Sequence, residues 1–451
     1  MDVVLLARIQ FALTIAFHYI FPPLSIGLGL LLVFMEGMYL KTKNPMYEQM
    51  TKFWVKIFGL TFAMGVASGI VMEFQFGTNW SHYSRFVGDV FGSALAAEGI
   101  FAFFLESGFL AVLLFGWDRV SPTMHFISTV LVMLGATFSA VWIVVANSWM
   151  QTPAGYHLVE DGGSIRAEIT DFWAMVFNPS AMDRLFHVIT GCWQAGAWLV
   201  LSVSAYYLLK KRHEDFAKAS IKIALVLALV ASLLQLASGH TSAIIVSKHQ
   251  PAKLAAMEGI YEENQPAAMS LFGWVDEKNE KLLYSLALPN FLSFLVHGDF
   301  NEPVQGLRAF PVDVRPPVNI VFQTYHGMVA IGMFLILLSM LGVFFWWRGT
   351  LFEKRWLLWI FVFAVLAPQI ANQIGWIVAE VGRQPWIVYG LMKTSEGVSR
   401  VVQSGQVLSS IIMFSFVYLL LFALFIFLLD SKIKTGPAEA KVNASGHRAE
   451  V

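Results

Sequence analysis

Residues 318–347 read VNIVFQTYHGMVAIGMFLILLSMLGVFFWW, thirty consecutive positions without an Asp, Glu, Lys or Arg. A helix that crosses the hydrocarbon core of a bilayer needs about 20 mostly apolar residues. This stretch therefore predicts a membrane-spanning helix. The same pattern recurs near residues 10–38, 52–74, 92–116, 122–146, 184–209, 218–246, 354–380 and 404–429. We predict an all-α, polytopic membrane protein with nine transmembrane helices.

The composition excludes several other classes of protein. Of the 451 residues, 57% are hydrophobic and 13% are charged, whereas a soluble domain carries about 25% charged residues. Thirty Lys and Arg balance thirty Asp and Glu, which leaves no basic surface for the phosphates of a nucleic acid. Cys192 is the single cysteine, so a disulfide framework or an iron–sulfur cluster within the chain is excluded.

The distribution of positive charge predicts the orientation. An odd number of spans places the termini on opposite sides, and short cytoplasmic segments are rich in Lys and Arg. With the N-terminus outside, seventeen of the thirty basic residues fall on the inner side, including the run Lys210-Lys211-Arg212. We therefore predict an outer N-terminus and a cytoplasmic C-terminus.

The spans divide the chain into four parts. Six helices are expected in residues 1–246, an extracytoplasmic loop in 247–317, three more helices in 318–430, and a cytoplasmic tail in 431–451. A loop of about 70 residues is unusually long for a compact protein, and such loops are usually functional.

Ionisable side chains inside spans are costly and are candidates for function. They are His18, Glu36, Glu73, Glu98, Glu106, His125, His187, His240, His326 and Glu380. For any one histidine, a structural hydrogen bond between helices is as reasonable as ligation or proton transfer. Several together, in a chain with 39 Phe and 15 Trp, favour an interior that encloses flat macrocycles. No two histidines are adjacent, and no two lie about two to four turns apart within one span, so any haem ligands come singly from separate helices.

The depth of four candidate ligands is similar. At a rise of about 1.5 Å per residue, His18, His187, Met328 and Glu380 lie within about 15 Å of the outer surface, below the loop. A His and Met pair suits a six-coordinate haem, and a lone His or Glu leaves a position open for oxygen chemistry.

Glu98 and Glu106 share the third predicted span, eight residues apart. A regular α-helix would place them about 80° apart around its axis and about 12 Å apart along it. They are expected to be two stations of a proton path; the alternative is two buried carboxylic acids without that role.

Five stretches, in order along essentially the whole chain, carry a resemblance to subunit I of the cytochrome bd quinol oxidase family. They are MEFQFGTNW (72–80), EG with FFLES (98–107), ANSWMQTP (146–153), QPAKLAAME (250–258) and, after Glu380, GRQPW (382–386). Residues 247–317 resemble the short form of this family's quinol-binding loop.

The resemblance implies three haems in the subunit, two haem b and one haem d. A low-spin haem b is expected on His187 and Met328, and the high-spin haem b and haem d on His18 and Glu380, without assigning which ligand holds which. His326 stands two residues before Met328, where some members have Arg. Only one of the two can face the haem, and we predict Met328.

The other site residues also follow from the resemblance. Glu98 and Glu106 are expected near the high-spin haems and in proton delivery, with Ser139 as a further member of the path. Arg383 is expected to face haem propionates. Lys253 and Glu258 are expected to bind the quinol from one short helical segment.

The implied activity is that of a terminal oxidase in the bacterial cytoplasmic membrane. It would oxidise quinol at the outer face, reduce O₂ to water with cytoplasmic protons, and generate proton motive force without pumping. Subunit II is the implied partner, and a small single-helix subunit is a further one. The alternatives are a cyanide-insensitive member with haem b in place of haem d, and a haem-free proton-coupled transporter.

Overall fold

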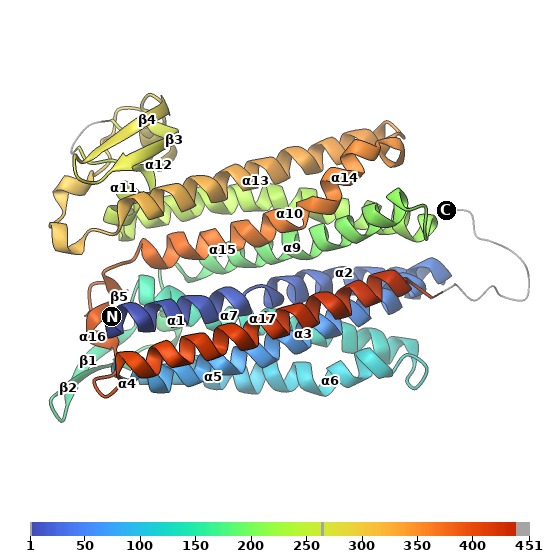
Figure 1. Cartoon of the computed structure of the whole chain (residues 1–451), viewed down its shortest axis with the longest axis horizontal. Helices are drawn as coiled ribbons and strands as arrows, with labels where there is room; N and C mark the ends of the chain where they lie inside the picture. Colours follow the sequence, from blue (N-terminus) through green and yellow to red (C-terminus); the bar gives the residue numbers. More distant parts are fainter. Residues whose placement is uncertain (1, 263–265, 439–451) are drawn as a thin grey trace, which may run out of the picture.

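A computed structural model describes residues 2–262 and 266–438 as a bundle of long helices (Figure 1). Within these residues, nine helical segments are long and apolar enough to cross a membrane, which confirms the predicted number of spans. The chain is therefore an integral membrane protein. The segments are α1–α2 (Val3–His18, Phe21–Thr42), α3 (Pro45–Thr78), α5–η1–α6 (Gly88–Glu98, Gly99–Phe103, Phe104–Phe115), α7 (Pro122–Gln151), α9 (Ala181–Leu209), α10 (Glu214–His249), α13 (Val318–Trp347), α14–α15 (Arg355–Ala364, Leu366–Val381) and α17 (Ser404–Thr435).

Most helices extend beyond the apolar stretches that predicted them, because caps rather than hydropathy decide where they end. Proline is the first residue of both α3 and α7, a position where its missing N–H is not needed. Asn44 accepts a hydrogen bond from the backbone N–H of Met46 at 2.9 Å, and Ser121 accepts one from that of Met124 at 3.3 Å.

Two spans are broken, a feature that the hydropathy pattern did not predict. The first breaks at residues 19–20, and the eighth breaks at Val365. Proline supplies the reason, because it cannot donate to the carbonyl four residues earlier and its ring clashes there. Pro22 and Pro23 follow the first break, and Pro368 follows the second.

The core of the bundle is α9, which is buried along most of its length and packs against α2, α10 and α14. Helices α2 and α9 approach closely at two glycines. A Cβ atom at Gly27 would lie 2.3 Å from the Cys192 carbonyl oxygen, and one at Gly196 would lie 2.4 Å from the Gly27 carbonyl carbon. α17 and the α5–α6 span are the least buried, and their apolar side chains form the periphery.

The long connections gather at one end of the bundle, which we call the loop end. The N-terminus lies there, and the described chain runs out at the opposite end (Figure 1). Residues 152–180 form β1 (Tyr156–Asp161), β2 (Ser164–Ile169) and α8 (Phe172–Val176). Residues 250–317 form α11 (Pro251–Glu258), β3 (Met269–Asp276), β4 (Lys281–Leu288), α12 (Phe291–His297), η2 (Leu307–Ala309) and η3 (Val312–Val314). Residues 382–403 form β5 (Trp386–Val388), β6 (Met392–Lys393) and α16 (Thr394–Gly397), while α4 (Ser81–Phe86) joins α3 to α5 and η4 (Leu351–Glu353) precedes α14.

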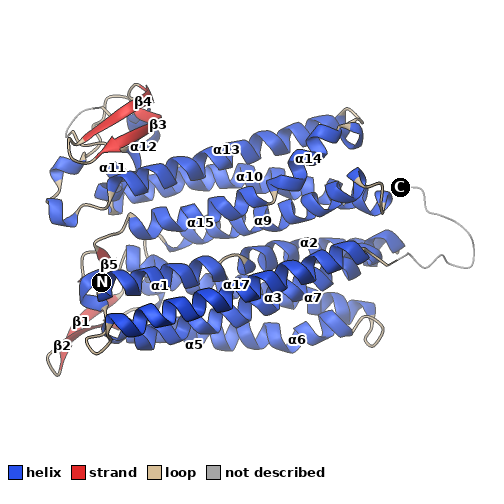
Figure 2. Cartoon of the chain, in the orientation of Figure 1, coloured by secondary structure: helices blue, strands red, loops and turns tan. Residues whose placement is uncertain are grey.

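The strands pair as three antiparallel hairpins, β1–β2, β3–β4 and β5–β6, and Figure 2 shows strands at the loop end. They add short extramembrane structure to the predicted all-α fold. The last helix continues to Thr435, past residue 431, where the cytoplasmic tail is expected to begin. Residues 439–451 of that tail lie outside the described residues.

Candidate functional site

His187 and His18 are held in the same way by a serine on a neighbouring helix. His187 Nδ1 lies 2.8 Å from Ser238 Oγ, and His18 Nδ1 lies 3.0 Å from Ser68 Oγ. Each serine hydroxyl donates to a backbone carbonyl of its own helix, so it accepts from the imidazole. The Nδ1 atom therefore carries the proton and Nε2 is an acceptor, which is the tautomer that a metal ligand requires. At His187 this Nε2 lies 2.8 Å from the Gln235 amide nitrogen, which donates to it.

Helix α15 lies between the elements that carry the candidate ligands. Gln373 Nε2 donates to the Ala16 carbonyl at 2.8 Å, beside His18. On another side, a Cβ atom at Gly375 would lie 2.9 Å from the Met328 sulfur, so this glycine leaves room for the thioether. α15 also packs against α9 and ends at Glu380 and Val381.

The depth of His187 matches that of Met328. Gly191 of α9 lies level with Asn372 of α15, because a Cβ atom at Gly191 would contact the Asn372 side chain at 2.8 Å. His187 is four residues nearer the loop end than Gly191, and the contact of Met328 with Gly375 is three residues nearer than Asn372. At about 1.5 Å per residue, His187 lies about 6 Å and the Met328 contact about 4.5 Å nearer the loop end than the level of Gly191 and Asn372.

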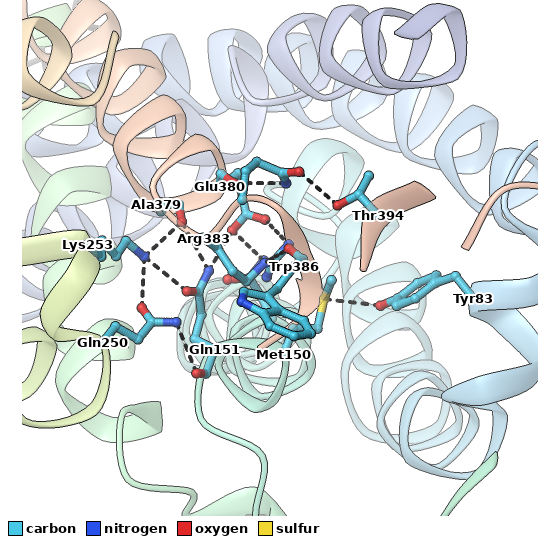
Figure 3. A network of polar contacts seen from close by, with 12 residues as sticks. Tyr83, Met150, Gln151, Gln250, Lys253, Ala379, Glu380, Arg383, Trp386 and Thr394 are labelled. Carbon is cyan, nitrogen blue, oxygen red and sulfur yellow. Dashed lines mark hydrogen bonds and ion pairs between the residues drawn. The ribbon is translucent and has the colours of Figure 1, made fainter. Parts of the chain in front are cut away.

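A buried polar network surrounds Glu380 (Figure 3). Its carboxylate pairs with Arg383 Nη2 at 2.5 Å and accepts hydrogen bonds from Asn147 at 3.1 Å and Gln151 at 3.2 Å. Asn147 in turn accepts a hydrogen bond from Arg184. Arg383 is only 4% exposed, so it contacts protein rather than lipid headgroups.

Lys253 belongs to this network. Its ammonium donates to the side-chain oxygens of Gln151 at 3.0 Å and Gln250 at 3.1 Å, and to the Ala379 carbonyl at 2.8 Å. Burial, reinforced by Arg184 and Arg383 and opposed by Glu380, lowers the pKa of Lys253 well below its usual value. All three N–H donors are used within the protein.

The network contains more positive than negative groups. Arg184, Lys253 and Arg383 lie around the carboxylate of Glu380, and Asp183 adds a second carboxylate near Arg184. Arg383 Nη1 and Arg184 Nε are buried and have no hydrogen-bond partner in the described part of the chain. Unpaired buried donors are costly, so this cluster is suited to an anionic group such as a carboxylate.

Glu98 and Glu106 lie on the same side of their helix, which corrects the expected 80° separation. The segment between them, η1, is a π-helical turn. A π-turn contains one extra residue per turn. The eight residues from Glu98 to Glu106 therefore rotate the chain only as far as seven residues of a regular α-helix, which places Glu106 at about −20° from Glu98 around the axis. Ser139 donates to Glu98 at 2.5 Å, and the Glu106 side chain packs over Gly135, one turn along α7.

A further buried pair lies toward the opposite end of the bundle. Glu36 Oε1 lies 2.6 Å from His125 Nδ1, and Thr129 donates to the other carboxylate oxygen. Both Glu36 and His125 are almost fully buried. The sequence marks both as ionisable groups in spans, but it does not show that they pair.

Glu258 and Lys253 lie on α11, and the expected short helical segment is present. The two side chains, however, contact different neighbours. Burial raises the pKa of Glu258 to about 7, and a hydrogen bond from Tyr325 of α13 opposes the rise. Glu258 Oε2 is buried without a hydrogen-bond partner among the described residues.

Both ring nitrogens of His326 lie within hydrogen-bond distance of backbone carbonyl groups. Its Nδ1 lies 2.9 Å from the Phe322 carbonyl, and its Nε2 lies 2.7 Å from the Ser270 carbonyl. The ring therefore faces strand β3, as expected if Met328, and not His326, is a ligand.

Sequence reasoning missed several residues that support the site. They are Ser68, Ser238, Gln235, Arg184, Asn147, Gln151 and Gln250. The signal available for Gln235 and Ser238 was a pair of polar residues three apart in an apolar span. Arg184 lies at the end of a predicted span, where a basic residue indicates orientation and gives no sign of a site.

The chain matches known proteins along nearly its whole length. A family model described as cytochrome bd terminal oxidase subunit I matches residues 6–437. The chain is 43% identical over 446 residues to the cytochrome bd ubiquinol oxidase subunit 1 of Bacillus subtilis, covering 97% of this chain and 94% of that protein. It is 34% identical over 503 residues to the cytochrome bd-II ubiquinol oxidase subunit 1 of Escherichia coli, covering 97% of each.

The fold is also shared with a solved structure. A chain of the bd oxidase from Geobacillus thermodenitrificans matches with a TM-score of 0.88 at 29% identity, covering 97% of this chain and 99% of that one. The chain therefore belongs to the cytochrome bd terminal oxidase subunit I family, and it is a quinol:O₂ oxidoreductase subunit with haem cofactors.

Proposed function

We propose that this chain is the haem-carrying subunit of a terminal respiratory oxidase in the bacterial cytoplasmic membrane. It oxidises quinol at the loop end, which faces outward, and O₂ is reduced to water with protons from the cytoplasm. It works with subunit II, and a small single-helix subunit is a further candidate partner. The observation that carries the proposal is the shared geometry of His18 and His187, whose Nδ1 atoms bond serine and whose Nε2 atoms are in the ligating tautomer.

The residues of the site fit the haems that the family implies. His187 and Met328 would hold a six-coordinate haem b, and His18 and Glu380 would hold a high-spin haem b and haem d. When bound, these haems supply electron transfer and oxygen chemistry. The unpaired N–H groups of Arg184 and Arg383 suit propionate carboxylates.

Glu258 is the proposed proton acceptor for quinol. Its pKa of about 7 suits a general base at neutral pH. Lys253 is proposed to act less directly, because its ammonium already donates to three protein oxygens. It would hold the quinol loop against α15 beside Glu380.

Glu106, Glu98 and Ser139 are proposed to carry protons toward the oxygen site from the cytoplasmic face. The support for this role is their alignment along the surface between α7 and the α5–α6 span. Protons released at one face and taken up at the other generate proton motive force without a pump. We expect subunit II to supply the remaining steps to the cytoplasmic surface.

A reduced-minus-oxidised absorption spectrum of the purified protein, with pyridine haemochrome quantitation, tests the proposal. A red-shifted chlorin band together with haem b is the expected result. Haem b alone would indicate the cyanide-insensitive type. A well-folded preparation without haem would contradict the oxidase function and favour a proton-coupled transporter.

A further inference from the structure

The β3–β4 hairpin is attached to the first two turns of a membrane-spanning helix. Three residues of α13 form hydrogen bonds with three backbone positions along β3. Asn319 Oδ1 accepts from the Val275 N–H at 3.4 Å, Gln323 donates to the Gly273 carbonyl at 2.8 Å, and His326 Nε2 lies 2.7 Å from the Ser270 carbonyl. These contacts cover eight residues of α13, about 10 Å of its length, so they fix the hairpin at the depth of this segment.

The charged turn of the hairpin and its apolar strand ends lie at different positions along α13. Its turn, residues 276–281, contains the sequence DEKNEK and lies beside the start of the helix, where Glu277 accepts from the Asn319 N–H at 2.8 Å. Glu280 in the same turn pairs with Arg308 at 2.9 Å and Arg315 at 2.8 Å. The apolar ends of the strands lie farther along α13, toward the middle of the bundle.

The hairpin carries large apolar side chains that the described residues of the chain leave exposed. Phe272 and Trp274 are each 56% exposed, and Leu286 is 54% exposed. Phe272 and Leu286 are cross-strand partners, so their side chains lie on the same face of the hairpin. In Figure 1 the hairpin lies at the edge of the bundle, beside the loop end of α13.

The face of α13 that holds the hairpin continues as an exposed apolar surface. At about 100° per residue, residues 319, 323 and 326 point in nearly the same direction as Met333 and Leu337. Those two side chains are 43% and 64% exposed within the apolar span. The hairpin therefore lies above an exposed apolar surface of α13 within a candidate membrane span.

We propose that the β3–β4 hairpin is a lipid anchor in the membrane interface at the loop end. Phe272, Trp274 and Leu286 contact lipid at the boundary between acyl chains and headgroups, while the charged turn remains in water. Aromatic residues favour this interface, and burial of apolar surface there binds extramembrane segments. The anchor holds the loop at the membrane surface and does not depend on the quinol chemistry.

Site-directed spin labelling of the intact oxidase in lipid nanodiscs tests the anchor. Cys192 is buried, so a Cys192→Ala background allows single labels at Phe272→Cys and Leu286→Cys. Lys278→Cys in the turn is the water-exposed reference, and Leu337→Cys is the lipid-exposed one. If Cys192→Ala does not assemble, the wild-type background serves, because its buried thiol should not react.

We expect the labels at 272 and 286 to collide more with dissolved O₂ than with a water-soluble nickel chelate, as at 337, and the opposite at 278. A nickel accessibility at 272 and 286 equal to that at 278 would overturn the proposal in favour of a water-exposed surface. Labels immobilised and inaccessible to both reagents would overturn it in favour of a protein partner.

Discussion

At the scale of single residues, the site depends on groups that orient its candidate ligands. Two imidazoles on different helices share one arrangement, in which a serine hydroxyl accepts from Nδ1 and donates to its own backbone. Such second contacts fix the tautomer and ring orientation of a ligand. Both serines lie ten or more residues from either end of their helices, and both are buried.

Replacing either serine should therefore weaken one haem site. We expect Ser238→Ala to lower occupancy or shift the midpoint potential of the low-spin haem, and Ser68→Ala to affect a high-spin haem. Loss of such contacts typically costs about 10- to 100-fold in metal affinity. Redox titration with haem quantitation measures the effect. Ser232→Ala is the matched control, because Ser232 is buried on the same helix as Ser238 without a hydrogen-bond partner in the described chain. An equal effect of all three variants would contradict the specific role.

Glu258 should make stability depend on pH near neutrality. Burial raises its pKa from 4.5 to about 7, so the folded protein keeps the proton over a range where the unfolded chain has released it. The stabilising contribution is present below pH 4.5 and is lost as pH rises through 7. We expect the melting temperature of the wild type to fall more between pH 5 and pH 8 than that of Glu258→Gln. Parallel curves for the two proteins would show that Glu258 does not titrate in this range.

Glu106 should affect oxygen reduction more than quinol oxidation. We expect Glu106→Gln to slow oxygen reduction while leaving the reduction of the low-spin haem by quinol fast, because a glutamine cannot pass on a proton. Stopped-flow absorption measures both rates. Glu214→Gln is a control, since Glu214 is an exposed carboxylate at the start of α10. Equal slowing of both reactions by Glu106→Gln would rule out this role.

At the scale of elements, breaks in regular helix decide which side chains meet. The π-turn η1 rotates Glu106 onto the side of Glu98, and Gly135 of α7 gives its side chain the space that it occupies. Such turns are rare and often lie at functional sites. The break at Val365 and the break at residues 19–20 lie near each other, because Gln369 of α15 donates to the Ile20 carbonyl, two residues from His18.

Removing the π-turn alone should keep the two acids aligned. Deletion of Ile100 leaves Glu98 and Glu106 seven residues apart, and a regular helix of seven residues rotates to about −20°, as the π-turn does. We therefore expect this variant to retain oxygen reduction, whereas deletion of both Ile100 and Phe101 should turn Glu106 away from α7 by about 100° and abolish it. Both side chains are exposed, so Ile100→Ala should keep the activity and serves as the control. Retained activity in a folded double-deletion variant would show that the alignment of Glu98 and Glu106 is not required.

At the scale of the whole molecule, the two ends of the bundle differ in charge and in length of connections. The loop end carries the long connections and the candidate ligands, and the other end carries short turns rich in Lys and Arg such as Lys210-Lys211-Arg212. α17 and the α5–α6 span leave most of their apolar surface exposed.

The charge difference predicts the topology in the membrane. We expect a fluorescent protein fused after residue 451 to fluoresce, because basic connections are retained in the cytoplasm. An alkaline phosphatase fusion at the same position should be inactive. A fusion within the β1–β2 hairpin should show the opposite pattern. Phosphatase activity at the C-terminus would reverse the orientation and move the proposed quinol site to the cytoplasmic side.

The sequence alone determined the class of the protein, the number of spans and most of the candidate ligands. Insertion of a helix into the bilayer depends on the summed hydrophobicity of its own residues, so apolar runs such as 318–347 can be recognised from the sequence. Polar residues within those runs, such as His187 and Glu106, are conspicuous for the same reason. The five motif stretches indicated the family, and the comparisons confirmed it.

Only the tertiary structure decided how these residues are arranged. The bond between His187 and Ser238 joins residues 51 positions apart. Two bonds of Lys253, to Gln151 and to the Ala379 carbonyl, join residues 102 and 126 positions apart. Its third bond, to Gln250, is local. The rotation of Glu106 depends on a π-turn stabilised against α7, and the hairpin takes its depth from α13. A linear pattern contains none of this information, because hydrogen bonds and packing between distant segments form only when the whole bundle has assembled.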